Sequence, residues 1–191
     1  MKKMTLIEMY NEVLVGAGYL PISAISSAGS PEEDMTALYL DRETNKLLSE
    51  GWWFNYDEDV TLTLDTNDKI PVPDTLIRIE FPGDDIIERD DFLYSKKDKS
   101  DIFTGNIDVV GWQVIAMEDL PYVAQQFVAK AATRKLVAVK AGDVGLLRSA
   151  IMDEQTARIE LVQAEGQHAN HNMLANPSLR GQIRRTPEGL R

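Results

Sequence analysis

The sequence has 191 residues, enough for one domain with a core of its own, and its 43% hydrophobic and 27% charged residues are typical of a globular chain. Its 31 acidic residues outnumber the 20 lysines and arginines, and the net charge of −11 opposes binding to nucleic-acid backbones and anionic membrane surfaces. The absence of cysteine excludes disulfides, thiol catalysis and thiolate-ligated zinc. No run approaches the ~18 apolar residues of a membrane-spanning helix, so we expect no membrane association.

Two helices are predicted in the N-terminal part of the chain. Thr5 and Glu8 have the spacing of a capping box, and apolar residues then recur at helical intervals, so the first helix covers about residues 5–16. Ser30 can cap a second helix of about residues 31–50.

The pattern then changes to the alternation of half-buried strands. Residues 52–117 are therefore predicted to form a small antiparallel β region. The clearest strands are expected at 60–64 and 76–81, and shorter ones near residues 91–94 and 107–116.

Two more helices are predicted after the β region, at about residues 120–140 and 144–165. The apolar side of the last helix contains Val144, Leu147, Ala150, Ile151, Ala157, Leu161 and Val162. Glu154 and Arg158 fall within this side in the favourable i, i+4 order. We interpret them either as an exposed ion pair at the edge of the apolar side or as a contact with a neighbouring subunit.

The fold class is thus α+β: an antiparallel bundle of four main helices, a small antiparallel β region inserted between helices two and three, and an extended C-terminal tail. The domain is expected to cover residues 1–169 and the tail residues 170–191. From Gly166 onward the chain has four arginines and one acidic residue, a net charge of +3, so the preceding residues carry −14. The chain is an acidic body with a basic tail.

Few residues are candidates for chemistry. His168 and His171 could share a helix face as metal ligands, but no third ligand follows in an ordered pattern, and solvated histidines are the simpler interpretation. The β region also has many carboxylates, and a glycoside hydrolase needs only two at the right separation. These acids are Asp65, Asp74, Asp84, Asp85, Asp90 and Asp91, and acids in loops are usually solvated. We therefore expect no catalytic residue, no metal and no cofactor.

An aromatic cluster follows the second predicted helix and consists of Trp52, Trp53, Phe54 and Tyr56. Such a cluster could be a ligand platform. Large rigid side chains at this point more often seal the junction between a helix and a sheet, so we predict a junction core.

From this cluster onward the sequence resembles the tail tubular protein A family, the head-to-tail adaptors of short-tailed bacteriophages. The resemblance starts with Gly-Trp-Trp-Phe-Asn at 51–55, Thr-Leu-Thr-Leu-Asp at 61–65 and Lys-Ile-Pro-Val-Pro at 69–73. It continues in order with Phe92-Leu93-Tyr94, Glu118-Asp119-Leu120-Pro121, Ala131-Ala132, Asp153-Glu154, Ala157 and Asn172-Met173-Leu174.

The resemblance implies a structural virion protein rather than an enzyme. Similar proteins assemble as dodecamers beneath the portal and carry the tail nozzle, and DNA passes through the ring without specific binding. The implied partners are thus other copies of the chain, the portal and the nozzle, and the implied location is the head–tail junction of a virion assembled in the host cytoplasm. Two alternatives remain open: a tail-associated glycan hydrolase using the aspartates of the β region, and a head-completion adaptor of a long-tailed phage.

The basic tail has too few apolar residues to fold alone. We expect residues 170–191 to dock on the portal or on an adjacent subunit, with Arg180, Arg184 and Arg185 against acidic patches. The simpler alternative is a solvated terminus.

Overall fold

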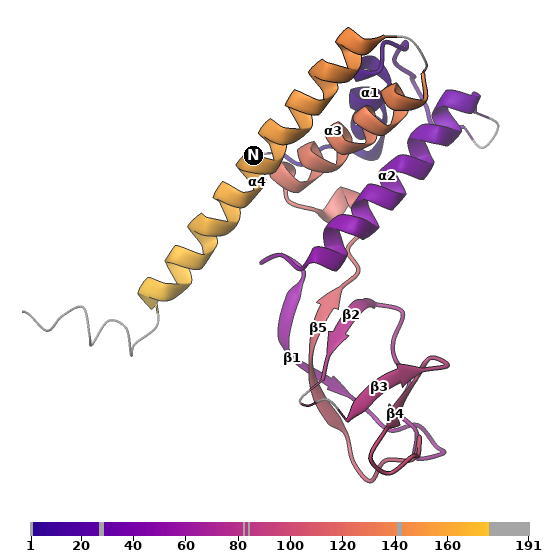
Figure 1. Cartoon of the computed structure of the whole chain (residues 1–191), viewed down its shortest axis with the longest axis vertical. Coiled ribbons are helices and arrows are strands. Elements are labelled where there is room, and N and C mark those ends of the chain that lie inside the picture. The colour runs from indigo at the N-terminus through magenta and orange to yellow at the C-terminus, as the bar shows by residue number, and fades with distance from the viewer. Residues whose placement is uncertain (1, 27–28, 82, 84, 141–142, 176–191) are drawn as a thin grey trace, which may run out of the picture.

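Helices form one end of the molecule and strands the other (Figure 1). The computed structural model describes residues 2–26, 29–81, 83, 85–140 and 143–175, with side chains as far as His168. This arrangement confirms the predicted α+β fold class, with the β region inserted between the second and third long helices.

The first two helices begin at the predicted caps. Helix α1 (Leu6–Gly16) has a complete capping box, in which the Thr5 side chain accepts from the Glu8 backbone N–H and the Glu8 side chain accepts from the Thr5 N–H. Hydrogen bonds with Thr5 lower the pKa of the Glu8 carboxyl. The bond from the Thr5 backbone N–H has the larger effect, and the bond from the Thr5 side chain adds to it. Helix α2 (Pro31–Glu50) starts with Ser30 accepting from the Glu33 N–H and ends at Gly51.

Helix α3 (Tyr122–Val139) lies at the centre of the bundle, in contact with α1, α2 and α4. A 3-10 turn η1 (Met117–Asp119) precedes it. The predicted start at residue 120 is therefore too early, and Pro121 is the N-cap rather than a first-turn residue, because the chain is still extended there. The small residues on this helix are fully buried and allow the close packing expected of them: Ala124, Ala129, Ala131 and Ala132.

Helix α4 (Val144–Ala175) is longer than predicted and extends past the other helices (Figure 1). Its 32 residues span ~48 Å. The predicted end at residue 165 is wrong because Gly166 does not interrupt the helix and no proline occurs before Pro177. Residues 170–175, predicted to belong to the tail, are helical, whereas Arg180, Arg184 and Arg185 lie outside the described residues.

The β region contains a three-stranded antiparallel sheet in the order β1–β5–β2. Strand β1 (Tyr56–Leu62) begins four residues before the predicted strand at 60–64 and has a register shift between Asp57 and Val60. Strands β2 (Leu76–Glu80) and β5 (Ile107–Gln113) lie where they were predicted. A separate small core of Leu62, Ile70, Leu93 and Val109 holds this region together.

A two-stranded hairpin completes the β region. Its second strand β4 (Phe92–Ser95) was predicted, but its first strand β3 (Ile86–Arg89) was not. The two residues between them, Asp90 and Asp91, have φ of 51° and 63°, as a tight hairpin turn requires. These two predicted candidate carboxylates are thus turn residues.

Candidate functional site

The aromatic cluster lies where the helices meet the sheet, but its members differ in burial. Trp52 is buried in the helical core, and Trp53 and Phe54 pack against that core. Tyr56 is 43% exposed, so it lies at the edge of the junction rather than in its core, with its ring tilted against Trp112 at 5.5 Å. Trp53 stacks on His168 at 4.9 Å and so connects α4 to the junction.

Asn55 is the polar centre of this junction and is only 2% exposed. Its side-chain oxygen accepts from the Trp52 N–H at 2.9 Å, and its side-chain amide donates to the carbonyls of Leu48 at 2.9 Å and Gln113 at 3.3 Å. These bonds connect the end of α2 to β5, so the turn between helix and sheet has a fixed geometry. Composition and periodicity gave no indication of this role.

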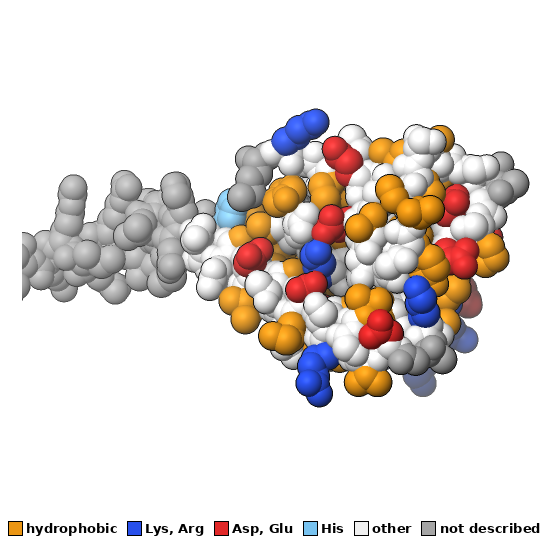
Figure 2. Space-filling view, turned by 90° about the horizontal axis from the view of Figure 1, so that it is seen from above, with side chains coloured by type: hydrophobic (Ala, Val, Ile, Leu, Met, Phe, Trp, Pro, Cys, Tyr) orange, Lys and Arg blue, Asp and Glu red, His pale blue; other side chains and the backbone are white. Residues whose placement is uncertain are grey.

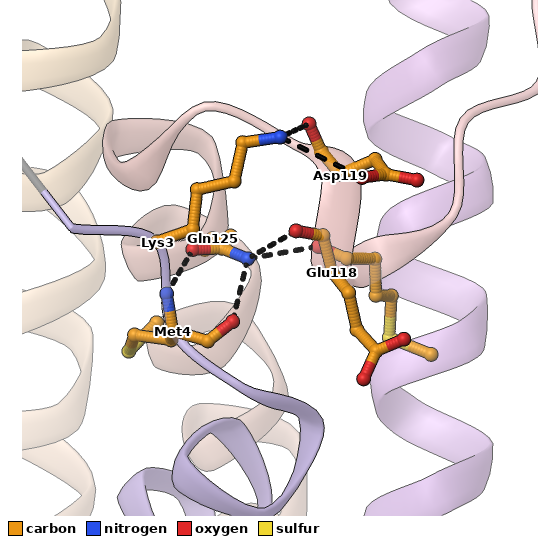
Figure 3. Close-up of polar contacts among 6 residues, drawn as sticks. Lys3, Met4, Glu118, Asp119 and Gln125 are labelled. Carbon is orange, nitrogen blue, oxygen red and sulfur yellow. Dashed lines mark hydrogen bonds and ion pairs between the residues drawn. The ribbon is translucent and has the colours of Figure 1, made fainter.

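Gln125 is a second buried amide side chain that joins segments distant in the sequence, as Figure 3 shows. It is fully buried on α3. Its side-chain oxygen accepts from the Met4 N–H at 2.7 Å, while its amide donates to the carbonyls of Met4, Met117 and Glu118 at 3.0–3.3 Å. Lys3 adds a bond to the Asp119 carbonyl at 2.7 Å. The start of the chain and η1 are therefore both attached to α3.

Glu154 and Arg158 are paired with other helices rather than with each other. Glu154 forms an ion pair with Arg134 of α3, and Arg158 lies 2.7 Å from the Glu50 carboxylate of α2. The Arg158 guanidinium also lies over the rings of Trp52 and Phe127, 4.8 and 5.2 Å from their centroids. Both side chains thus contribute to the packing of α4 within the chain.

Helix α4 has a second apolar face that no other element covers within the described part of the chain. The predicted apolar side splits: Leu147, Ala150, Ala157 and Leu161 are buried or packed on the helical core, whereas Val144, Ile151 and Val162 point to solvent. With Met152 and Ile159, the exposed three form an arc of about 100°, which we call the outer face of α4. Its five members, Val144, Ile151, Met152, Ile159 and Val162, are 38–73% exposed.

The outer face exposes more apolar surface on one helix than is usual for a monomeric protein. Arg148 and Gln155 are the polar residues between its apolar members, and both are exposed. Figure 2, a view onto the helical end, shows further hydrophobic side chains at the surface among acidic and basic ones. Contiguous exposed apolar side chains of this kind mark surfaces that pack against other molecules.

The described aspartates that were considered for catalysis lie in turns or are exposed to solvent. Asp65 accepts from the N–H groups of Asn67 at 2.8 Å and Lys69 at 2.9 Å, and these bonds lower the pKa of its carboxyl, with Lys69 the larger cause. Asp74, Asp85, Asp90 and Asp91 are exposed, and Asp84 lies outside the described residues.

The histidines have no metal-like arrangement in the part of the chain that the structure describes. His168 stacks on Trp53, and the His171 side chain lies outside that part. Within the same described residues, no group of three or more His, Cys, Asp or Glu side chains is placed to hold a metal ion.

An apolar helix face that is exposed to solvent is a feature of a subunit that assembles with other chains. The chain belongs to the tail tubular protein family, whose model matches residues 7–171. It is therefore a structural component of a bacteriophage tail. No match was found among curated proteins.

The family match covers both the helical bundle and the β region, so the resemblance noted at residues 51–55 extends over nearly all of the described chain. None of the helices within the described ranges combines the length and apolar character that a bilayer span requires.

Proposed function

We propose that the protein is a head-to-tail adaptor: copies form a closed ring, of twelve subunits by the resemblance, between the portal and the tail nozzle. Membership of the tail tubular protein family supports a place in the tail. The resemblance in sequence to the adaptors of short-tailed phages supports the more specific position at the head–tail junction.

The outer face of α4 is the observation that most directly supports assembly into a ring. Burial of a face with five apolar side chains on one helix is favourable, by about 25 cal/mol per Å² of apolar surface removed from water. A ring interface joins two different surfaces of identical subunits, so each subunit can offer its outer face to the next. Because Glu154 and Arg158 are already paired within the chain, the apolar residues beside them are our candidates for the subunit contact.

The charge of the chain fits a conduit for DNA. Residues before the basic C-terminal part carry −14 of formal charge, and acidic groups facing a central channel repel phosphates. A genome passing such a surface would experience little electrostatic retention, consistent with passage without specific binding.

The proposal is tested by mixing the purified protein with the portal protein encoded in the same genome and measuring mass by light scattering. We expect a complex whose mass fits one portal with a ring of many copies of this chain. The protein alone and the portal alone are the controls. A mixture in which the two proteins keep their separate masses would contradict the adaptor function.

A further inference from the structure

A groove of about 660 Å³ opens at the helix–sheet junction, between α2, β1, β5 and the distal part of α4. All three tryptophans of the chain, Trp52, Trp53 and Trp112, line it, together with Tyr56. Its shape depends on Gly51, where a Cβ atom would lie 2.1 Å from Trp112 Nε1. We call this site the junction groove.

The junction groove is acidic. Glu50, Asp57, Glu58 and Glu165 line it, and of these Glu50 has an arginine partner, Arg158 at 2.7 Å. Among the described side chains, no lysine or arginine lies within 4.0 Å of the other three carboxylates. Three carboxylates without a cationic partner favour a positively charged occupant.

The titration of Tyr56 reflects the same surroundings. Partial desolvation raises the pKa of its phenol, and the charges of Glu58 and Glu80 raise it further. The phenolate is disfavoured first by this desolvation and then by the neighbouring carboxylates.

The aromatic walls select the type of cation. Two of the three indoles already carry a guanidinium on their faces: Arg158 lies 4.8 Å from the Trp52 centroid and Arg78 lies 4.3 Å from the Trp112 centroid. Arginine is thus a cation that these indoles already accept, and carboxylates beside indole faces together fit an arginine-bearing peptide.

The chain itself contains such a peptide. Residues 176–191 have four arginines and one acidic residue and begin directly after Ala175. His168, which lines the groove, is seven residues before Ala175, or ~10 Å of helix. The five residues from Ala175 to Arg180 can span ~17 Å when extended, so the tail can return to the groove of its own chain.

We propose that residues 176–191 dock in the junction groove of the same chain, with Arg180, Arg184 and Arg185 against its carboxylates and indoles. Tethering favours this occupant because the tail is held close to the groove at a high effective concentration. The contact needs no neighbouring copy, so it does not depend on the ring.

Intrinsic fluorescence tests this contact directly, because every tryptophan lines the groove and the chain has no cysteine. Ser178→Cys in the full chain introduces a single thiol for a nitroxide label, a quencher of tryptophan emission. We expect quenching that ascorbate reduction of the nitroxide abolishes. Quenching should be lost in the groove variant Glu58→Gln/Glu165→Gln and in the tail variant Arg184→Gln/Arg185→Gln.

The matched control is Glu88→Gln/Glu160→Gln, which removes the same charge from exposed positions outside the groove and should keep the quenching. Far-ultraviolet circular dichroism verifies that each variant is folded. Unquenched emission in the labelled parent chain, or equal quenching in the groove variant and its control, would overturn the proposal.

A second sample tests whether the tail in the groove belongs to the same chain or to a neighbouring copy. The labelled groove variant is refolded together with unlabelled parent chain, whose groove is intact. We expect unquenched emission, because the unlabelled tail of each parent chain occupies the groove of that same chain and leaves no site for the labelled tail. Quenching in this mixture would mean that the tail of a neighbouring copy occupies the groove and would contradict docking within one chain.

Discussion

Asn55 fixes the geometry of the helix–sheet junction through three hydrogen bonds made by a side chain that is almost fully buried. Asn55→Ala leaves the Trp52 N–H and the Leu48 and Gln113 carbonyls without this partner. We expect a loss of about 1–3 kcal/mol in the free energy of unfolding, the usual cost of buried polar groups left unsatisfied. Urea unfolding followed by circular dichroism measures it.

The control for this change is Asn67→Ala, in an exposed turn. It should alter the free energy of unfolding by no more than about 0.5 kcal/mol. Equal effects of the two substitutions would show that Asn55 does not support the junction.

Gly51 is required by both its backbone and its surroundings. Its φ is +82°, which disfavours any side chain, and an added Cβ would meet the Trp112 ring. We expect Gly51→Ala to lower the free energy of unfolding by about 1–3 kcal/mol and to change tryptophan emission. Gly105→Ala, at a glycine with no heavy atom within 4 Å of the added Cβ, should be nearly neutral. A neutral Gly51→Ala would contradict the close approach to Trp112.

At the residue scale, the sequence predicted what depends on near neighbours. The caps at Thr5 and Ser30 were predicted because their partners are three residues away. The roles of Asn55 and Gln125 were not, because Gln113 is 58 residues from Asn55 and Met4 is 121 residues from Gln125. Tyr56 was expected in the core with its neighbours, but strand alternation turns it toward solvent.

At the scale of elements, helices with clear periodicity and caps were predicted almost to the residue, as α1 and α2 show. Strand β3 was missed because its turn, Asp90-Asp91, lacks the glycine that usually marks a two-residue hairpin. The two apolar faces of α4 were merged into one side, since periodicity does not tell which face meets α3 and which meets solvent.

The turn after β1 makes the β region sensitive to acid. Backbone bonds from Lys69 and Asn67 lower the pKa of Asp65, and a hydrogen bond from the Lys69 side chain lowers the pKa of Asp101. Both carboxylates therefore stabilise the fold above the ordinary aspartate pKa of about 3.9, and this contribution is lost as the pH falls through the lowered values.

The Asn67 and Lys69 amide signals in NMR spectra report this titration, because their N–H groups donate to Asp65. We expect their midpoint below the ordinary aspartate value and its disappearance in Asp65→Asn. A midpoint at or above the ordinary value would contradict the proposed turn.

At the scale of the whole molecule, the chain has two hydrophobic cores joined by a hydrogen-bonded junction. The helical core includes Trp52, the β core is centred on Leu62 and Leu93, and Ile77 of β2 packs on the helical side. Ion pairs connect α3 to its neighbours, Glu12 with Lys130 and Glu154 with Arg134 among them. Contacts of this kind suit the proposed ring, in which each subunit must present its surfaces to its neighbours in the same orientation.

Assembly was the part least accessible from sequence. Composition gave the acidic body and the basic tail, and the family resemblance gave the expected ring. Neither identified the outer face of α4, because Met152 and Ile159 are indistinguishable from core residues until α3 is seen to pack on the opposite side.

The most direct test of the account is the mass, by light scattering, of Met152→Lys/Ile159→Lys mixed with the portal protein, beside the parent chain. Both side chains are exposed, so the isolated variant should unfold as the parent does. Leu20→Lys/Ile102→Lys, which places the same charges on exposed apolar positions elsewhere, is the control. We predict a ring-sized complex for parent and control and its loss in the α4 variant; a ring of full mass with the α4 variant would contradict the outer face of α4 as the subunit contact.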